Sequence, residues 1–244
     1  MVKLLTRSIK SCLLIIVSAT AANAQVTWDS TNPSGIFAAS GTTTSFNVTT
    51  TATTAGSDRV GLLGCAVGDV SVVTGATWNG SAMTQLVSRT NGTDGRGVVI
   101  YWIAAPPTTS STVNISFSGG GTTVVCGVGS VNAAHQTVQD GNTNGADYTT
   151  TPTTLSCTRN TNELVFDFVY ALNGGAVPTA SGGTKLNHSD QGTWYGAGSY
   201  NTSSGSMGWD ITGITRASEA CVSIKPASAA SVRCCGGPMK GLIH

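Results

Sequence analysis

The sequence is poor in charged residues. Asp, Glu, Lys and Arg make up 9% of its 244 residues, against roughly 25% in ordinary soluble domains. It has no basic cluster that would follow a phosphate backbone, so nucleic acid is not an expected partner. Histidine occurs three times and no Gly-x-Ser-x-Gly sequence is present, so the chain has little material for a hydrolase triad. We therefore do not expect an enzyme.

Helical periodicity and long apolar runs are also missing after residue 24. No stretch there repeats apolar residues at helical spacing, and none is long enough to cross a membrane. The sequence instead contains roughly a dozen short strand-like runs, with turn residues about every 8 to 12 positions. This pattern predicts an all-β fold, an antiparallel β-sandwich of jelly-roll type.

The first 24 residues have the features of a signal peptide. Lys3, Arg7 and Lys10 precede an apolar stretch that is short for a membrane span, and Ala22-Asn-Ala24 supplies the small residues of a cleavage site. Cleavage would leave nine basic and eleven acidic residues, a net charge near −2. The sequence thus predicts a secreted protein, extracellular or at a cell surface, with no membrane span in the mature chain.

The strongest strand signals lie between residues 73 and 118. Gly97–Ala105 is the densest run of β-branched and aromatic residues, and Thr112–Ser118 alternates with period two. Asn79-Gly80 between two short apolar arms predicts a hairpin. Further strands are predicted at Thr42–Thr49, Arg59–Val67, Gly121–Val131, Thr153–Arg159, Glu163–Leu172 and Ala220–Lys225.

The domain boundaries follow from composition. Residues 25–226 are predicted to form one sandwich domain, in which Asn132–Pro152 is a long polar loop. Residues 227–244 lose the alternation and predict a flexible tail containing Cys234-Cys235. No internal repeat divides the domain further.

Six cysteines follow the leader, and they are Cys65, Cys126, Cys157, Cys221, Cys234 and Cys235. An exported chain passes through an oxidising compartment, so one or two disulfides are expected. A buried thiol also packs much as Ala or Val does, so bridged and merely buried cysteines are both open for the first four. The sequence allows three pairings among those four.

One segment has the spacing of a calcium loop. The run from Asp140 to Asp147 matches the first half of that pattern, with oxygen ligands at Asp140, Asn142 and Asn144. The twelfth position is Thr151 rather than Glu and no helices flank the run, so an ordinary polar turn is the alternative. Calcium is the one cofactor that the sequence suggests.

Carbohydrate binding is the function that the sequence favours. Sandwich modules bind glycans by stacking sugar rings on exposed aromatic side chains, while Asn and Asp contact the hydroxyls. The candidate rings are Trp78, Trp194, Tyr195, Tyr200 and Trp209. Aromatic residues are only 6% of the chain, so the alternative is that the core uses these rings.

Two other functions remain open. A structural subunit of an extracellular assembly would contact copies of itself through edge strands or Cys234-Cys235. A glycoside hydrolase is a more distant alternative, because Glu163 and Asp167 share a strand face about 13 Å apart, beyond the spacing of a catalytic pair. Clusters of Thr also raise ice or mineral binding, but they are confined to one region.

The order of the pieces resembles an uncharacterised β-sandwich module of secreted bacterial and phage-associated proteins. The matching residues are Arg59–Val67, the run from Val73 to Thr84 with its Trp-Asn-Gly turn, Ile100–Pro107 with its Tyr-Trp strand and Pro-Pro break, and Val222–Ala227. The resemblance covers most of the chain from Arg59 to Ala227 and implies a sandwich fold and an extracellular setting. It carries no catalytic residues. We expect the glycan binding to take place at a cell or virion surface.

Overall fold

Antiparallel strands make up most of the described chain. The computed structural model describes residues 24–29, 31–32, 35–51, 56–90, 92, 94–137, 143–149, 153–172, 176–203 and 206–228. These ranges contain nineteen strands and one 3-10 turn, Val70–Val72, and all pairs of neighbouring strands within them are antiparallel. The predicted all-β antiparallel sandwich is confirmed, while its jelly-roll type stays a prediction. Within the described ranges, no helix has the length and hydropathy to span a membrane.

The strands form one unit by their contacts, Asn23–Ser228. The predicted signal peptide up to residue 23 and the tail from residue 229, with Cys234-Cys235, lie outside the described residues.

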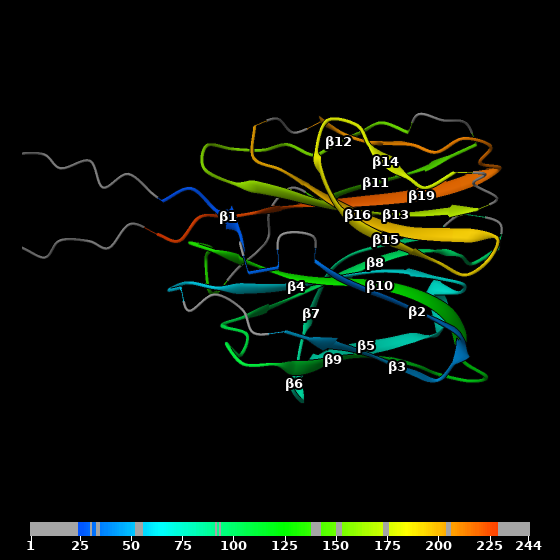
Figure 1. The fold of residues 1–244 in the computed structure, drawn as a ribbon, viewed down its shortest axis with the longest axis horizontal. Coiled ribbons are helices and arrows are strands. Elements are labelled where there is room, and N and C mark those ends of the chain that lie inside the picture. The colour runs from blue at the N-terminus through cyan, green and yellow to red at the C-terminus, as the bar shows by residue number, and fades with distance from the viewer. Residues whose placement is uncertain are drawn as a thin grey trace, which may run out of the picture. The chain divides into compact units, whose positions relative to one another are not determined.

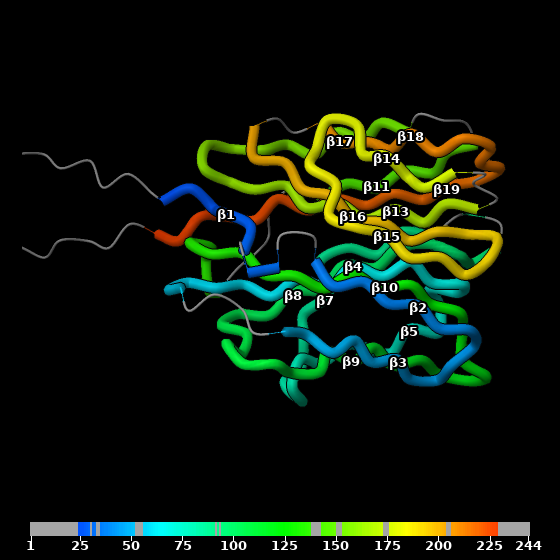
Figure 2. Tube along the Cα trace, viewed as in Figure 1, coloured from blue at the N-terminus to red at the C-terminus, as the bar shows by residue number. Residues whose placement is uncertain are grey.

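Three sheets are stacked in layers, with sheet A in the middle (Figures 1 and 2). Sheet A contains β1 (Thr27–Trp28), β2 (Ile36–Thr43), β4 (Val60–Val67), β7 (Thr84–Thr90), β8 (Gly97–Ala104) and β10 (Thr122–Asn132). Sheet B contains β3 (Ser45–Thr50), β9 (Ser111–Phe117), β5 (Val73–Trp78) and β6 (Ser81–Ala82), in that order. Sheet C contains β11 (Thr143–Tyr148), β19 (Arg216–Ile224), β13 (Leu164–Leu172), β16 (Trp194–Asn201) and β15 (Thr184–Asp190), in that order.

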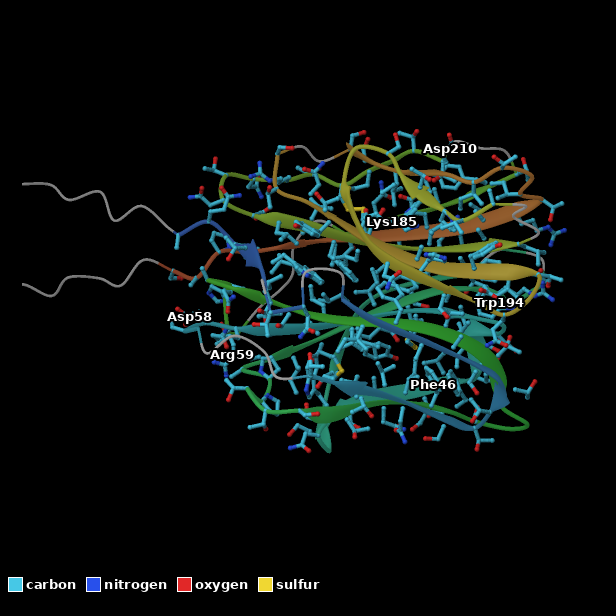
Figure 3. The ribbon with its side chains drawn as sticks, in the orientation of Figure 1. Phe46, Asp58, Arg59, Lys185, Trp194 and Asp210 are labelled. Carbon is cyan, nitrogen blue, oxygen red and sulfur yellow. A yellow bond between two sulfur atoms is a disulfide. The ribbon has the colours of Figure 1, made fainter. Side chains whose placement is uncertain are left out.

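Sheet A is buried on both faces, because its central strands are apolar at odd and even positions alike. On β4, Leu62 belongs to the core shared with sheet C, and Leu63 belongs to the core shared with sheet B. Val98 and Val99 on β8 divide in the same way. The side chains fill both spaces between the three ribbon layers (Figure 3).

Four short strands cover the outer face of sheet C, and we call them the cap. They are β12 (Leu155–Ser156), β17 (Ser206–Met207), β14 (Thr179–Ala180) and β18 (Trp209–Asp210), paired β12 with β17 and β14 with β18. Two small apolar clusters lie between the cap and sheet C, one around Trp209 and Val169, the other around Met207 and Val165. The cap therefore buries a sheet face that would otherwise meet solvent.

The structure confirms the predicted hairpin and corrects the predicted loop. Asn79 and Gly80 both have positive φ, and Trp78 pairs with Ser81 across the turn. The long loop expected at Asn132–Pro152 is wrong, since β11 lies within it and pairs with β19 along six residues. The segment is too polar to predict a strand, but an edge strand buries less of its surface than a central one.

Candidate functional site

The three tryptophans predicted to bind glycans are buried, which corrects that expectation. Their side chains belong to cores, with relative exposures of 1% for Trp78, 6% for Trp194 and 0% for Trp209. Trp194, labelled in Figure 3, packs against Tyr170 between sheets A and C, with ring centroids 5.2 Å apart. A chain this poor in aromatic residues uses its large rings to fill interiors, so these indoles are not available to a sugar.

The two predicted tyrosines do not form a joint platform. Tyr195 and Tyr200 are both partly buried and lie on opposite faces of β16, five residues apart. Tyr200 stacks on Trp28 with ring centroids 5.2 Å apart, and Tyr195 lies 6.3 Å from the ring of His188. Neither ring presents a free, flat surface next to the other.

The predicted calcium loop is described only in part. Asp140 and Asn142 lie outside the described residues, while Asn144 and Asp147 lie on β11 and point to opposite faces of it. The amide of Asn144 donates to the Ser156 carbonyl oxygen, 2.8 Å away. Within the described ranges, no group of three or more His, Cys, Asp or Glu side chains is placed to hold a metal ion.

Four of the predicted cysteines form two disulfides, Cys65–Cys126 and Cys157–Cys221. The first joins directly opposed residues of β4 and β10, in the core between sheets A and B. The second joins the segment of β12 to β19 and so ties the cap to sheet C. The sequence predicted these cysteines as candidates but left the pairing open.

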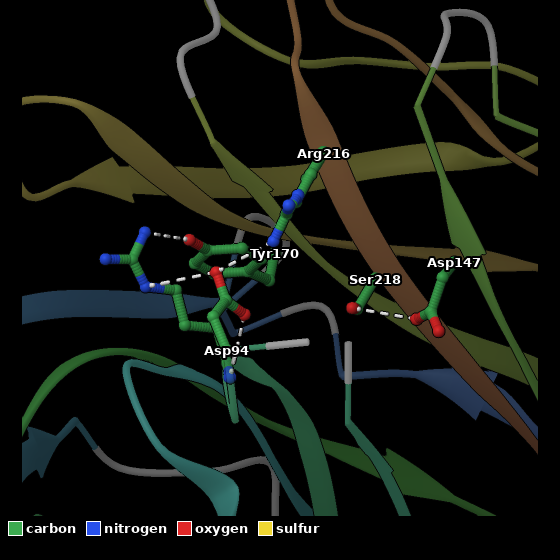
Figure 4. A network of polar contacts seen from close by, with 6 residues as sticks. Asp94, Asp147, Tyr170, Arg216 and Ser218 are labelled. Atoms are coloured by element: carbon green, nitrogen blue, oxygen red, sulfur yellow. Dashed lines mark hydrogen bonds and ion pairs between the residues drawn. The ribbon is translucent and has the colours of Figure 1, made fainter. Parts of the chain in front are cut away.

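Charged side chains gather where sheets A and C meet at one edge (Figure 4). Arg89 on β7 forms an ion pair with Asp147 on β11 at 2.9 Å, and Asp147 also accepts from Ser218 Oγ. Because Arg89 lies in sheet A and Asp147 in sheet C, their ion pair joins the two sheets.

The same edge holds a second set of contacts (Figure 4). Asp94 pairs with Arg216 at 3.4 Å and with Arg96 at 3.7 Å. Arg96 also donates to the Tyr170 hydroxyl. That hydrogen bond is the main cause of a raised pKa for Arg96, whereas burial is the main cause of the raised pKa of Tyr170.

The carboxyl groups considered for a hydrolase do not line a cleft. Glu163 is buried and accepts from Asn160 and from Ser223 Oγ, while Asp167 is buried beneath the cap. Asp167 has a neighbour that sequence reasoning did not pair with it, Glu219 on β19, also fully buried. Strand register could have suggested this pair, because β13 and β19 lie side by side in sheet C.

The outer face of sheet B presents a regular set of polar side chains among the described residues, and we call it the polar face. Its side chains are Ser45, Asn47 and Thr49 at alternate positions of β3, Thr112, Asn114 and Ser116 at alternate positions of β9, and on β5 Thr77 together with Thr74, which lies at a register shift of the strand. All eight are uncharged hydroxyl or amide groups. Their neighbours in sequence, such as Val48, Val113 and Ile115, point into the core.

The polar face is ordered by its own hydrogen bonds. Asn47 and Asn114 lie directly opposite each other, as do Ser45 and Ser116. The Asn114 amide nitrogen donates to Asn47 Oδ1 at 2.8 Å and to Ser45 Oγ at 2.6 Å, and Ser116 Oγ donates to Asn114 Oδ1 at 2.8 Å. Period-two alternation predicted the strands. The register between the strands then places their polar side chains side by side in rows.

Comparison of the chain with protein-family models, curated proteins and solved structures finds no match.

Proposed function

We propose that this chain is an exported, non-catalytic binding module and that its polar face binds a neutral glycan. The observation that carries the proposal is the set of eight uncharged polar side chains on the outer face of sheet B. Glycans without charge present hydroxyl groups, which both donate and accept hydrogen bonds, as do Ser, Thr and Asn side chains. This replaces the aromatic platform that the sequence suggested.

The order of the polar face favours binding. Asn114 is held by Ser45 and Asn47, so its amide loses little rotamer freedom when a ligand arrives. Trp78 lies beneath the same sheet and donates to Ser111 Oγ at 2.8 Å, which supports the sheet from its buried side. A site prepared in this way binds with a smaller entropy cost than one built on mobile loops.

Two features support an exported protein. The leader has the three regions of a signal peptide. The two disulfides are typical of proteins that fold in an oxidising compartment.

A glycan array probed with the full secreted chain tests the proposal, followed by calorimetry on any hit. The double variant Asn47→Ala/Asn114→Ala removes both amides and should weaken binding by about tenfold or more, because each lost hydrogen bond costs about 1 kcal/mol. The affinity should change little with salt, since the polar face holds no charge.

The matched control is Asn187→Ala/Ser189→Ala on β15, a polar strand of sheet C far from sheet B in the layer order. It should leave binding unchanged. A blank array, together with self-association that the Asn47→Ala/Asn114→Ala variant abolishes, would instead favour a structural subunit. Equal loss in both double variants would contradict the assignment of the face.

A further inference from the structure

Two carboxyl groups lie next to each other beneath the cap. Asp167 on β13 and Glu219 on β19 both point to the outer face of sheet C, and both have a relative exposure of 0%. Apolar clusters flank them on either side, around Val169 and Trp209 on one and around Val165 and Met207 on the other. Charged residues are almost never buried in such a place unless they are paired.

The hydrogen bonds of the two groups are unequal. Asp167 accepts from the Ser199 backbone N–H at 3.0 Å, from Ser199 Oγ at 2.5 Å and from the Trp209 indole N–H at 3.1 Å. Both carboxyl oxygens of Glu219 are buried without a hydrogen-bond partner among the described residues. Three donors favour an ionised Asp167, whereas an ionised Glu219 would have only the neighbouring Thr153 hydroxyl or a protonated Asp167 to stabilise it.

The electrostatics indicate that the pair as a whole holds a proton. Burial raises the pKa of Asp167 well above its ordinary value, and the neighbouring charge of Glu219 raises it further. Burial also raises the pKa of Glu219. Two carboxylates this close in a dry site do not both ionise readily, so such pairs hold a proton between them.

The polar groups that face the pair come from four segments around it. They are Tyr148 on β11, Thr153 ahead of β12, Ser199 on β16 and Trp209 on β18. Tyr148 is the titratable one, and its pKa is raised to about 12 by burial first and by the charge of Glu219 second. Neither carboxyl has a basic partner within the described ranges.

The pair is linked to the cap through Trp209. The Trp209 backbone N–H donates to Thr153 Oγ1 at 2.8 Å, and the Thr153 N–H donates to the Trp209 carbonyl at 2.7 Å. Thr153 is in turn a polar neighbour of Glu219. The strands β13 and β19 are held by nine consecutive register pairs, whereas β18 pairs with its neighbour over two.

We propose that Asp167 and Glu219 share one proton and that this proton keeps the cap closed on sheet C. When the proton leaves, a second negative charge appears in a space with donors for only one. The central strands cannot separate without breaking the sheet, so the charge is relieved when β18 and the segment around Thr153 lift and admit water. The pair is thus a pH-dependent latch. The inference is independent of glycan binding, which is assigned to sheet B.

A cation between the two carboxyls is a poorer explanation. Calcium takes six to eight oxygen ligands, and N–H and O–H donors already point at both oxygens of Asp167. These donors would face the cation with their positive ends.

The experiment follows the cap in the full secreted chain between about pH 5 and about pH 9 by hydrogen exchange, corrected for the intrinsic pH dependence of exchange. The segments 153–158 and 206–211 should exchange about tenfold faster at the upper pH, while β13 and β19 stay protected. The Trp209 indole N–H resonance, assigned from a Trp209→Phe variant, should shift with the same midpoint.

Glu219→Gln is the decisive variant, because glutamine has the shape of protonated Glu and cannot ionise. It should keep the cap closed over the whole range and remove the midpoint. Glu163→Gln is the matched control, a buried carboxyl one residue before β13 that already has its donors, and it should leave the midpoint in place.

Three results would overturn the proposal that a shared proton keeps the cap closed. One is a cap whose exchange and indole resonance do not change with pH. Another is a midpoint that persists in Glu219→Gln. The third is a cap that opens on addition of EDTA and closes with calcium at constant pH, which would assign the pair to a cation.

Discussion

Gly64 on β4 lies against the ring of Phe168 on β13, across the core between sheets A and C. A Cβ built on Gly64 would be 2.3 Å from Phe168 Cδ2, closer than real side-chain contacts allow. Gly64→Ala should therefore cost about 1–3 kcal/mol of unfolding free energy through overpacking. Urea titration measures it, with Gly41→Ala as the control, because a Cβ at Gly41 meets nothing within 4 Å. Equal effects of the two changes would mean that the sheets separate easily.

Trp102 tests the position of the central strand. Its side chain is in the core between sheets A and C, on β8. Trp102→Ala should lower the unfolding free energy by about 3–5 kcal/mol, because a large cavity is left in a packed interior. A loss below about 1 kcal/mol in a denaturant titration would contradict the packing of β8.

The two disulfides should stabilise the fold by similar amounts. They close loops of nearly equal length, with sequence separations of 61 and 64 residues. Replacing either pair by Ala should cost about 2–5 kcal/mol, since both loops restrict the unfolded chain to a similar degree. Thermal or denaturant unfolding of the two double variants checks this. Because all four cysteines are buried, a thiol reductant without denaturant should leave both bonds intact, which mass spectrometry after alkylation can detect.

The carboxyl pair should also give the whole fold a pH dependence of known sign. The folded pKa values of Asp167 and Glu219 are raised, mainly by burial, whereas unfolded carboxyls titrate near about pH 4. The folded state therefore binds more protons above that pH, so this contribution to stability is fully present below about pH 4 and is lost as pH rises through the raised values.

The measurement is the unfolding free energy of the wild type minus that of Glu219→Gln across this range. The difference should fall steadily with rising pH. A difference that is flat or that increases would have the wrong sign for a buried protonated pair.

The ion pair of Arg89 and Asp147 should contribute little by comparison. Its side chains are 40% and 29% exposed, so water and salt screen the attraction. Arg89→Ala should cost less than about 1 kcal/mol, and most of that should vanish in high salt. A salt-independent loss of several kcal/mol would show that the contact between β7 and β11 depends on packing of the Arg89 stem.

The sequence predicted the strands well wherever they are strongly apolar. Arg59–Val67 and Gly97–Ala105 differ from β4 and β8 by one residue at an end. The prediction failed for β11, whose residues are those of a turn and which is a strand only because β19 offers it an edge. Local composition does not contain that information.

The candidate site was harder to predict, because it depends on which side chains face outward. The sequence marked Trp78, Trp194 and Trp209 as possible contacts, but a ring's exposure follows from the layer that covers it. The third layer and the cap, which bury these rings, were not predicted. The ranks on the polar face and the pairing of Asp167 with Glu219 need strand register, which one sequence does not provide.

The double burial of sheet A has a consequence for how the chain finds its alignment. In most strands, a slip by one residue turns apolar side chains to water and is rejected. On β4, a slip by one residue would only exchange Leu62 and Leu63 between two apolar cores. What it would disturb are the small residues, since Gly64 would leave Phe168 and Cys65 would leave Cys126. Gly64 and Cys65 therefore specify the register of β4 in sheet A. The large apolar residues stabilise the sheet without specifying that register.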